Sequence, residues 1–376
     1  MKKILVISDH PTHPVTGGNR MCIMQYVEVL QNNGFEVHLL YIHGVMSDEA
    51  YRNATIKFWG KRFHEYKTTR MQYYVQRIAA RFKLDSNDRW IDLLYPWGLT
   101  DYIEKLHRQY KFIGMICIYP WMSKAMNCSI LHKVLYTHDV FSNRNQRVRG
   151  AEWYSFPVEQ EMKALKRCPI IFSMQDEEST FYRYLLPKSK IVTAYSSFAK
   201  VEHPIVGNKN ILFFSGGQML NLNAFYYFMS EVLPLLVEKD EDIKLIVGGY
   251  ICETLKNESL HPNVVLKGLY DTPADFYAEG DIVINPVSEG TGLKIKTIEA
   301  VAHGKATVVD KHSLVGVYSP SFFPVLVART PQEYVHHILR YMANEDKLHD
   351  IKNKDFEYLD MLNEYITKQY LEVFSK

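Results

Sequence analysis

The chain has 376 residues, of which 47% are hydrophobic and 23% charged, and its net charge at pH 7 is +2. This composition excludes a disordered or fibrous protein, and no apolar run approaches the roughly 20 residues that span a bilayer. The length suits two domains with separate cores. The five cysteines are scattered without a CxxC pair. Their scatter argues against a disulfide framework or a zinc ribbon and favours a cytoplasmic protein.

Short apolar runs alternate with helical patterns along the whole chain. In the first half we predict strands at 3–8, 36–42, 112–119, 133–138, 169–174 and 190–194, and helices at 21–34, 152–167 and 175–186. In the second half we predict strands at 210–216, 243–249, 263–268, 281–286 and 306–310, and helices at 223–239 and from Leu293 onward. Buried strands separated by helices form parallel βαβ units. The pattern therefore predicts an α/β protein with two doubly wound, Rossmann-like domains.

The segment 198–210 has no hydrophobic periodicity and is the best linker between the two series. We expect an N-terminal domain at 1–200 and a C-terminal domain at 201–355. The chain is helical after Pro331, and its last helix, 356–376, is expected to pack back on the N-terminal domain. Doubly wound sheets bind ligands beyond the carboxyl ends of their strands, so functional residues are expected in the loops that follow strands.

Gly17 and Gly18 lie in the loop after the first strand, directly before a helix. Because glycine has no Cβ, backbone N–H groups there can approach a phosphate or a sugar. The loop is neither GxGxxG nor a P-loop, which disfavours nicotinamide and ATP as ligands. An ordinary flexible turn explains the same two residues.

His138 and Asp139 follow the strand at 133–138, and Arg144, Arg147 and Arg149 come shortly after them. A histidine at a strand end can donate to a hydroxyl or a phosphate, and arginines can bind anions with two hydrogen bonds. Alternatively, the histidine is satisfied by a backbone carbonyl and the arginines are solvated.

The stretch 288–304, SEGTGLKIKTIEAVAHG, joins a small-residue turn to a helix. Lys294 and Lys296 lie near the helix start, where the macrodipole disfavours cations and favours anions. A bound diphosphate would reverse the sign of this effect. Gly290 and Gly292 would then give access to the backbone, and Glu299 could accept from a ribose diol. The alternative is that Lys296 and Glu299 form a surface i,i+3 ion pair.

The segment Lys57–Lys83 contains eight Lys and Arg residues and one acid, Glu65, interleaved with aromatic residues. No nucleic-acid recognition motif accompanies it, so we do not expect nucleic acid as a partner. An amphipathic element on an anionic membrane fits the composition better, and a solvated face over a local core fits about equally well. We include Lys61 and Arg62, together with Arg144, among residues that would contact an acceptor or a membrane.

Taken in order, these motifs resemble the retaining glycosyltransferases of family 4, which have the two-domain GT-B fold. The resemblance covers almost the whole chain, from ILVISDHPTHPVTGGNR through YTHDVFSNR to ILFFSGGQMLNLNAFYYF, LIVGG, NVVLKGLYDTPADFYAEGDIVINP and GTGLKIKTIEAVAHGKATVV. It implies two Rossmann-like domains that face each other across a cleft. A UDP- or GDP-sugar would be held mainly by the C-terminal domain, and a saccharide or lipid-linked saccharide acceptor would face the N-terminal domain.

The resemblance also assigns roles to residues. Glu299 matches the second of the family's two motif glutamates, which is expected on ribose. Gly17 and Gly18 match the loop near the donor phosphates, and His138 matches the histidine near the transferred sugar. Tyr270 and Asp271 fall in the loop that borders the nucleobase pocket.

Two departures from the family pattern stand out. Its glutamates are eight residues apart, whereas Glu289 and Glu299 are ten apart, so either Glu289 or Thr291 contacts the sugar. The loop SGGQMLNLN also lacks the family's Arg and Lys, and we expect Lys294 and Lys296 to supply that charge.

The resemblance implies a hexosyl-type transferase of surface glycan synthesis that needs no cofactor and no metal, located in the cytoplasm or on the inner face of the membrane. The departures leave open a degenerate subunit that only binds and stabilises a partner glycosyltransferase. An epimerase on the same fold is a third reading.

Overall fold

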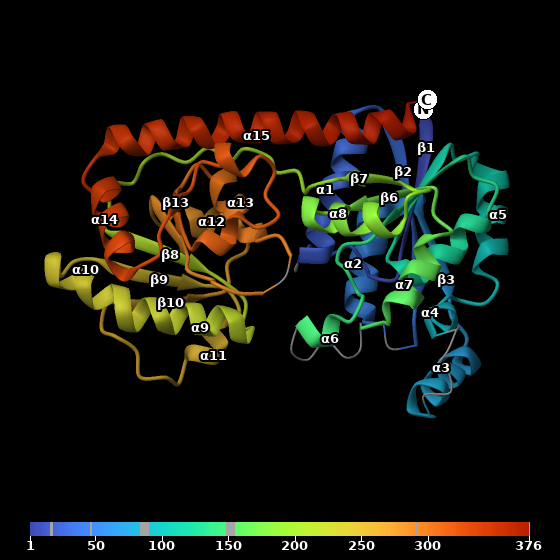
Figure 1. Cartoon of the computed structure of the whole chain (residues 1–376), viewed down its shortest axis with the longest axis horizontal. Coiled ribbons are helices and arrows are strands. Elements are labelled where there is room, and N and C mark those ends of the chain that lie inside the picture. Colours follow the sequence, from blue (N-terminus) through green and yellow to red (C-terminus); the bar gives the residue numbers. More distant parts are fainter. Residues whose placement is uncertain (16–17, 46, 83–89, 148–154, 291, 376) are drawn as a thin grey trace. The chain divides into compact units, whose positions relative to one another are not determined.

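The computed structural model describes residues 1–376 except 16–17, 46, 83–89, 148–154, 291 and 376. The chain forms two compact units, one of Met1–Ser197 with Tyr365–Lys376 and one of Phe198–Glu364. From the sequence we expected the N-terminal domain to end at residue 200 and the C-terminal domain to end at residue 355. Each unit is built on one sheet of parallel strands flanked by helices (Figure 1).

The sheet of the first unit has seven strands in the order β3-β2-β1-β4-β5-β6-β7. These are β1 (Lys2–Ser8), β2 (Phe35–His43), β3 (Phe63–Lys67), β4 (Gly114–Ile118), β5 (His132–Tyr136), β6 (Ile170–Ser173) and β7 (Lys190–Thr193). Its helices are α1 (Gly18–Asn32), α2 (Glu49–Trp59), α3 (Arg70–Phe82), α4 (Trp90–Leu93), α5 (Leu99–Tyr110), α6 (Arg144–Arg147), α7 (Val158–Leu165) and α8 (Asp176–Leu185). Ile4, Leu5, Val6 and Ile7 of β1 are fully buried, as expected for a strand covered on both faces.

The sheet of the second unit has six strands in the order β10-β9-β8-β11-β12-β13. They are β8 (Asn210–Phe214), β9 (Lys244–Gly248), β10 (Val264–Gly268), β11 (Ile282–Asn285), β12 (Ala306–Val309) and β13 (Leu326–Val327). The helices are α9 (Met219–Tyr227), α10 (Leu233–Lys239), α11 (Ile251–Leu255), α12 (Pro273–Tyr277), α13 (Ile295–Ala302), α14 (Pro331–Met342) and α15 (Glu345–Phe374). A π-helical turn, Phe228–Val232, joins α9 to α10.

Alternate residues of β8 enter two separate cores in the second unit. Ile211 and Phe213 pack in the larger core, whereas Leu212 packs in a smaller one with Phe276 and Ala300. Side chains of a strand alternate between the two faces of its sheet, so both faces are covered. This arrangement confirms the predicted doubly wound architecture.

The order of the strands reverses at one point in each sheet. In the first unit the reversal lies between β1 and β4, and in the second it lies between β8 and β11. The loops that follow these strands diverge to opposite faces and leave space at the carboxyl edge of the sheet. Both candidate sites described below lie at these reversals.

The last helix is longer than the sequence suggested, because α15 runs without a break from Glu345 to Phe374. Leu348 and Ile351 belong to the larger core of the second unit. Residues from Tyr365 onward belong to the first unit, where the Tyr370 ring lies 5.1 Å from the Phe172 ring.

Gly249 allows the loop after β9 to pass close to the loop after β8. Its φ is +93°, and a Cβ on it would lie 2.3 Å from the carbonyl oxygen of Ser215. Gly268 has a similar φ of +77°, but a Cβ there would meet nothing within 4 Å. Backbone contact therefore requires glycine at 249, whereas only the positive φ favours it at 268.

We predict that Gly249→Ala lowers the melting temperature of the protein much more than Gly268→Ala does. A left-handed backbone alone costs about 1–2 kcal/mol for a residue with a Cβ, and both variants carry that cost. Only Gly249→Ala must also displace the Ser215 backbone. Thermal unfolding followed by circular dichroism measures the difference, and equal melting temperatures would contradict the clash.

Candidate functional site

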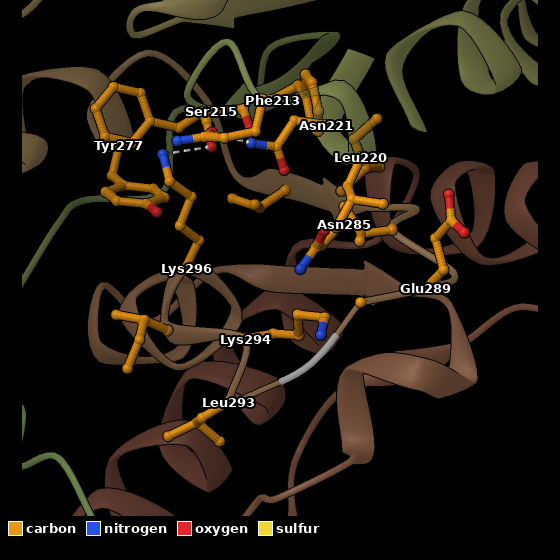
Figure 2. Close-up of a pocket in the computed structure, with 17 residues that line it drawn as sticks. Phe213, Ser215, Leu220, Asn221, Tyr277, Asn285, Glu289, Leu293, Lys294 and Lys296 are labelled. Carbon is orange, nitrogen blue, oxygen red and sulfur yellow. Dashed lines mark hydrogen bonds between the residues drawn. The ribbon is translucent and has the colours of Figure 1, made fainter. Parts of the chain in front are cut away.

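A pocket of about 250 Å³ opens at the carboxyl ends of β8 and β11, where the second sheet reverses its strand order. The loops after these strands and the start of α13 line it (Figure 2). The lining residues are Phe213, Phe214, Ser215, Gln218, Leu220, Asn221, Tyr277, Val283, Ile284, Asn285, Val287, Glu289, Gly290, Leu293, Lys294, Ile295 and Lys296.

Lys296 is the main charged group on the side of the pocket formed by β8. Its Nζ donates to the carbonyl oxygen of Phe214, 3.0 Å away, and lies 4.2 Å from the centroid of the Phe214 ring. Burial lowers the pKa of Lys296 to about 8, although the nearby Glu299 opposes the change. A carbonyl dipole and an aromatic face compensate only part of the lost hydration of an ammonium. The Lys296 ammonium would therefore gain from an anion in the pocket.

Lys294 adds a second positive charge at the N-terminal end of the same helix. It is the residue before α13, and its Nζ donates to the carbonyl oxygen of Gly292 at 3.2 Å. Burial lowers its pKa as well. Both lysines thus lie at the positive end of a helix dipole, as the sequence predicted.

Gly290 shapes the loop that precedes these lysines. Its φ is +102°, and a Cβ would come within 2.8 Å of Leu220. His312 fixes the carbonyl oxygen of Gly290 through Nε2 at 2.8 Å. The glycine thus permits the loop to lie against Leu220 at the pocket wall.

Glu299 lies beside the pocket without lining it. Its side chain is buried and accepts a hydrogen bond from the Tyr277 hydroxyl, with an oxygen–oxygen distance of 3.2 Å. Burial raises the pKa of Glu299 despite the opposing effects of Lys296 and Tyr277. The alternative left open by the sequence, a surface ion pair with Lys296, is wrong, because Glu299 is buried and Nζ of Lys296 donates to Phe214.

Tyr277 is also supported by a pair of histidines, His303 and His203. Its ring stacks on His303, with centroids 4.3 Å apart, and His303 Nδ1 lies 2.8 Å from His203 Nε2. Burial lowers the pKa of His303 to about 3, so its ring is neutral at ordinary pH. The wall of the pocket next to Glu299 is therefore fixed by uncharged rings.

Glu289 lies at the other end of the pocket from Lys296 and Tyr277 (Figure 2). Its carboxylate is exposed and lies 3.5 Å from Nδ2 of Asn223. Thr291, the other candidate for contact with a sugar, lies outside the described residues. Glu289 is thus the motif glutamate that the described structure brings to the pocket.

Other residues singled out from the sequence are not part of the pocket lining. Gly292 has a φ of +78° and precedes the lining residue Leu293. Tyr270 donates to Glu279 at 3.1 Å, and Asp271 is exposed in the loop before α12.

His138 lies in the first unit, beyond the carboxyl end of β5. Its backbone is left-handed with φ +62°, and its buried Nε2 has no hydrogen-bond partner among the described residues. Burial lowers the pKa of His138 to about 3, so the ring is neutral. The alternative, in which a backbone carbonyl satisfies the histidine, does not hold for Nε2 among the described residues. Nε2 remains available to a ligand hydroxyl.

Asp9 and His10 form a polar pair at the end of β1, which the sequence reasoning missed. One Asp9 oxygen lies 2.7 Å from His10 Nδ1, and the other accepts from Trp121 Nε1 at 2.9 Å. Burial raises the pKa of Asp9, but its hydrogen bonds and the charge of His10 outweigh this and lower it. The signal available in the sequence was their position directly after the first strand. Of the neighbouring glycines, Gly18 begins α1 and Gly17 lies outside the described residues.

The arginines after β5 bind their own loop. Arg144 forms a salt bridge with Asp139 at 2.7 Å, and Arg147 donates to the carbonyl oxygens of Val140 and Ser142. Arg149 lies outside the described residues. Contacts within the loop therefore satisfy Arg144 and Arg147 without a ligand.

The basic segment 57–83 is not one amphipathic element, which corrects the expectation. It comprises the end of α2, the edge strand β3 and the helix α3. Lys61 and Arg62 lie in a short 3₁₀ turn between α2 and β3, where the Arg62 guanidinium is 5.5 Å from the Trp59 ring.

The polar wall of the pocket was also missed from the sequence. Ser215, Gln218 and Asn221 follow β8, and Asn285 ends β11 with its amide donating to Thr297 at 2.7 Å. Their positions after two adjacent strands were the only signal, since none of these residue types is diagnostic by itself.

In the described part of the chain, no three His, Cys, Asp or Glu side chains gather as the ligands of a metal ion would. Among the described residues there is also no helix that is long and apolar enough to cross a membrane.

Residues 208–344, which contain the pocket, match the family model described as glycosyl transferases group 1. A relative from Klebsiella pneumoniae, named as an uncharacterized 44.6 kDa protein in the cps region, is 23% identical over 394 residues. That match covers 96% of each chain.

Several solved structures have the same fold over the whole chain. TarM of S. aureus has a TM-score of 0.69 at 14% identity, with coverage of 100% of this chain and 99% of TarM. HepE of Anabaena in complex with UDP has a TM-score of 0.64 at 14% identity, with full coverage of both chains. The pneumococcal O-GlcNAc transferase GtfA in complex with UDP and GlcNAc gives 0.66 at 9% identity, covering 100% and 98%. The expected GT-B fold is confirmed.

Proposed function

We propose that this chain, which carries a group 1 glycosyl transferase domain on a GT-B fold, transfers a sugar from a nucleoside-diphosphate sugar to a saccharide or lipid-linked saccharide acceptor. The observation that carries the proposal is the Lys296 ammonium, which lines the pocket between the ends of β8 and β11 and is held only by the Phe214 carbonyl and ring among the contacts described above. A diphosphate is the ligand that best matches two desolvated lysines at a helix start.

In the proposed donor complex, Lys296 and Lys294 bind the diphosphate, with Gly290 and Gly292 giving close access to the backbone. Glu299 accepts from the ribose diol, and Tyr270 and Asp271 border the nucleobase. Glu289 or Thr291 contacts the sugar. The same lysines and the helix-end N–H groups stabilise the negative charge that develops on the leaving diphosphate.

In the first unit, we assign His138 to a hydroxyl of the transferred sugar and Gly17 and Gly18 to the donor phosphates. The unpartnered Nε2 of His138 supports its assignment. Because its ring is neutral, it can accept or donate a hydrogen bond but brings no charge.

The proposed reaction retains the anomeric configuration and needs no metal. A departing phosphate oxygen takes the proton of the acceptor hydroxyl on the same face of the sugar, while the bond from the anomeric carbon to the diphosphate breaks and that to the acceptor oxygen forms. The transferred group is a hexosyl unit in this proposal.

The comparisons support the choice of donor and of pathway. The solved structures of HepE, TarM and GtfA contain UDP, and one of HepE contains UDP-glucose. We therefore expect a UDP-sugar before a GDP-sugar. The relative in the cps region supports a role in surface-polysaccharide synthesis. A lipid-linked acceptor would place the protein at the inner face of a membrane.

We predict that Lys296→Ala weakens UDP binding by about tenfold or more, because one charge-assisted hydrogen bond contributes roughly 1.5–3 kcal/mol. Lys311→Ala is the matched control, since it removes an exposed lysine of the same unit. Isothermal titration calorimetry measures both, and equal affinities for the two variants would refute the assignment of Lys296.

The affinity of the unmodified protein for UDP should fall as the pH rises through about 8. The pKa of Lys296 is lowered to about 8, so the ammonium that meets the diphosphate is present below that pH and lost above it. The same titration on Lys296→Ala should be much flatter between pH 7 and 9. A slope that survives the substitution would assign the pH dependence to another group.

Purified protein should transfer sugar from a UDP-sugar, or hydrolyse it slowly without an acceptor, at a rate that EDTA does not change. Lys296→Ala should lose most of this activity while Lys311→Ala keeps it. Mass spectrometry of the products and of released UDP is the measurement. UDP binding without any turnover would favour the degenerate subunit, and an epimerised free sugar would favour an epimerase.

A further inference from the structure

Helix α3 of the first unit has polar side chains on its inner face and apolar side chains on its outer face. Its glutamines face inward: Gln72 is 2% exposed and donates to the carbonyl oxygen of Tyr95 at 2.8 Å. Gln76, one turn later, donates to the carbonyl oxygen of Leu93 at 2.7 Å. The Trp97 N–H in turn donates to Gln72 at 2.9 Å. Polar contacts with the segment 93–97 therefore hold α3 on the unit.

The outward face of α3 is apolar. Its residues recur at the i, i+3, i+4 and i+7 spacing that forms one stripe on a helix, and all are exposed: Met71 66%, Tyr74 60%, Val75 38% and Ile78 52%. A stripe of this spacing normally faces a protein core. Four exposed apolar side chains in register on one helix mark a surface that meets a partner.

Positive charge borders this stripe. Arg70 and Arg77 are exposed and lie on neighbouring helical positions seven residues apart. Lys57, Lys61 and Lys67 precede the helix in the sequence. Glu65 is the only acid between residues 57 and 82, and Arg52 Nη2 donates to it at 2.8 Å. The part of the chain that leads into α3 and forms it, residues 57–82, is therefore strongly basic. Figure 1 shows the helix at the margin of the first unit.

We propose that α3 docks this protein on an anionic lipid membrane, with Met71, Tyr74, Val75 and Ile78 entering the headgroup boundary and Arg70 and Arg77 contacting lipid phosphates. An apolar stripe with a basic border is what an interfacial helix requires, and tyrosine favours that boundary. A second copy of the chain fits less well, because its own basic border would face this one. The inference rests on α3 alone and adds a docking surface to the proposed function.

The test is sedimentation of the full chain with vesicles of phosphatidylcholine, with and without phosphatidylglycerol. The unmodified protein should bind vesicles that contain phosphatidylglycerol, and added salt should weaken that binding. The double variant Met71→Glu/Ile78→Glu should raise the apparent Kd for these vesicles by about tenfold or more, since two acids replace the apolar anchors. Arg70→Gln/Arg77→Gln, which keeps the apolar stripe, should weaken binding and flatten its salt dependence.

Leu131→Glu/Tyr184→Glu is the matched control, because it adds the same charge at two exposed apolar residues of the same unit, 74% and 87% exposed. It should bind vesicles nearly as the unmodified protein does. The proposal is overturned if α3 variants and control bind alike, or if the unmodified protein ignores phosphatidylglycerol. A lipid-free dimer that Met71→Glu/Ile78→Glu abolishes would also overturn it, by assigning the stripe to a second copy. UDP affinity, measured separately on each variant, reports on the proposed function independently of these outcomes.

Discussion

The proposed donor pocket depends on one ion–dipole contact, between the Lys296 ammonium and the carbonyl oxygen of Phe214 at the end of β8. The contact ties the first turn of α13 to the central strand of the sheet and holds a positive charge out of water. Burial is unfavourable for that charge, as the lowered pKa of Lys296 shows. A diphosphate at Lys296 would stabilise this cation, so the proposed donor would regain on binding the free energy that burial of the charge costs.

The fold supplies this contact through the reversal of strand order between β8 and β11. The loops after the two strands diverge there, and a glycine in each of two loops, after β9 and after β11, lets the chain pack closely around the space. Gly249 admits the backbone of Ser215 on one side, and Gly290 lies against Leu220 on the other. The first unit repeats the plan between β1 and β4, where Asp9, His10 and Trp121 gather. Because the two sheets share this topology, polar side chains gather beyond the carboxyl ends of the strands in both units.

The sequence predicted the strands that read as apolar runs, including the edge strands β7 and β10, and missed two other edge strands, β3 and β13. Strands such as β1 and β11 are continuous apolar runs, whereas β3, FHEYK, is a polar edge strand and β13 has only two residues. Lys294 and Lys296 were predicted because cations at a helix start are unusual. Asn285 and Gln218 were not, because only the folded sheet brings them together. The inward glutamines of α3 could not be foreseen either, since their partners are backbone carbonyls more than fifteen residues away.

Lys296 is the group proposed to bind the donor diphosphate, and the pKa of that single amine reports this contact directly. Nuclear magnetic resonance of lysine amines, with Lys296→Ala to assign the signal, gives this pKa with and without UDP. We expect a value of about 8 in the free protein and a clear rise when UDP binds, because a diphosphate favours the charged amine. A pKa that stays the same at saturating UDP would show that the nucleotide does not meet Lys296, and would contradict the account.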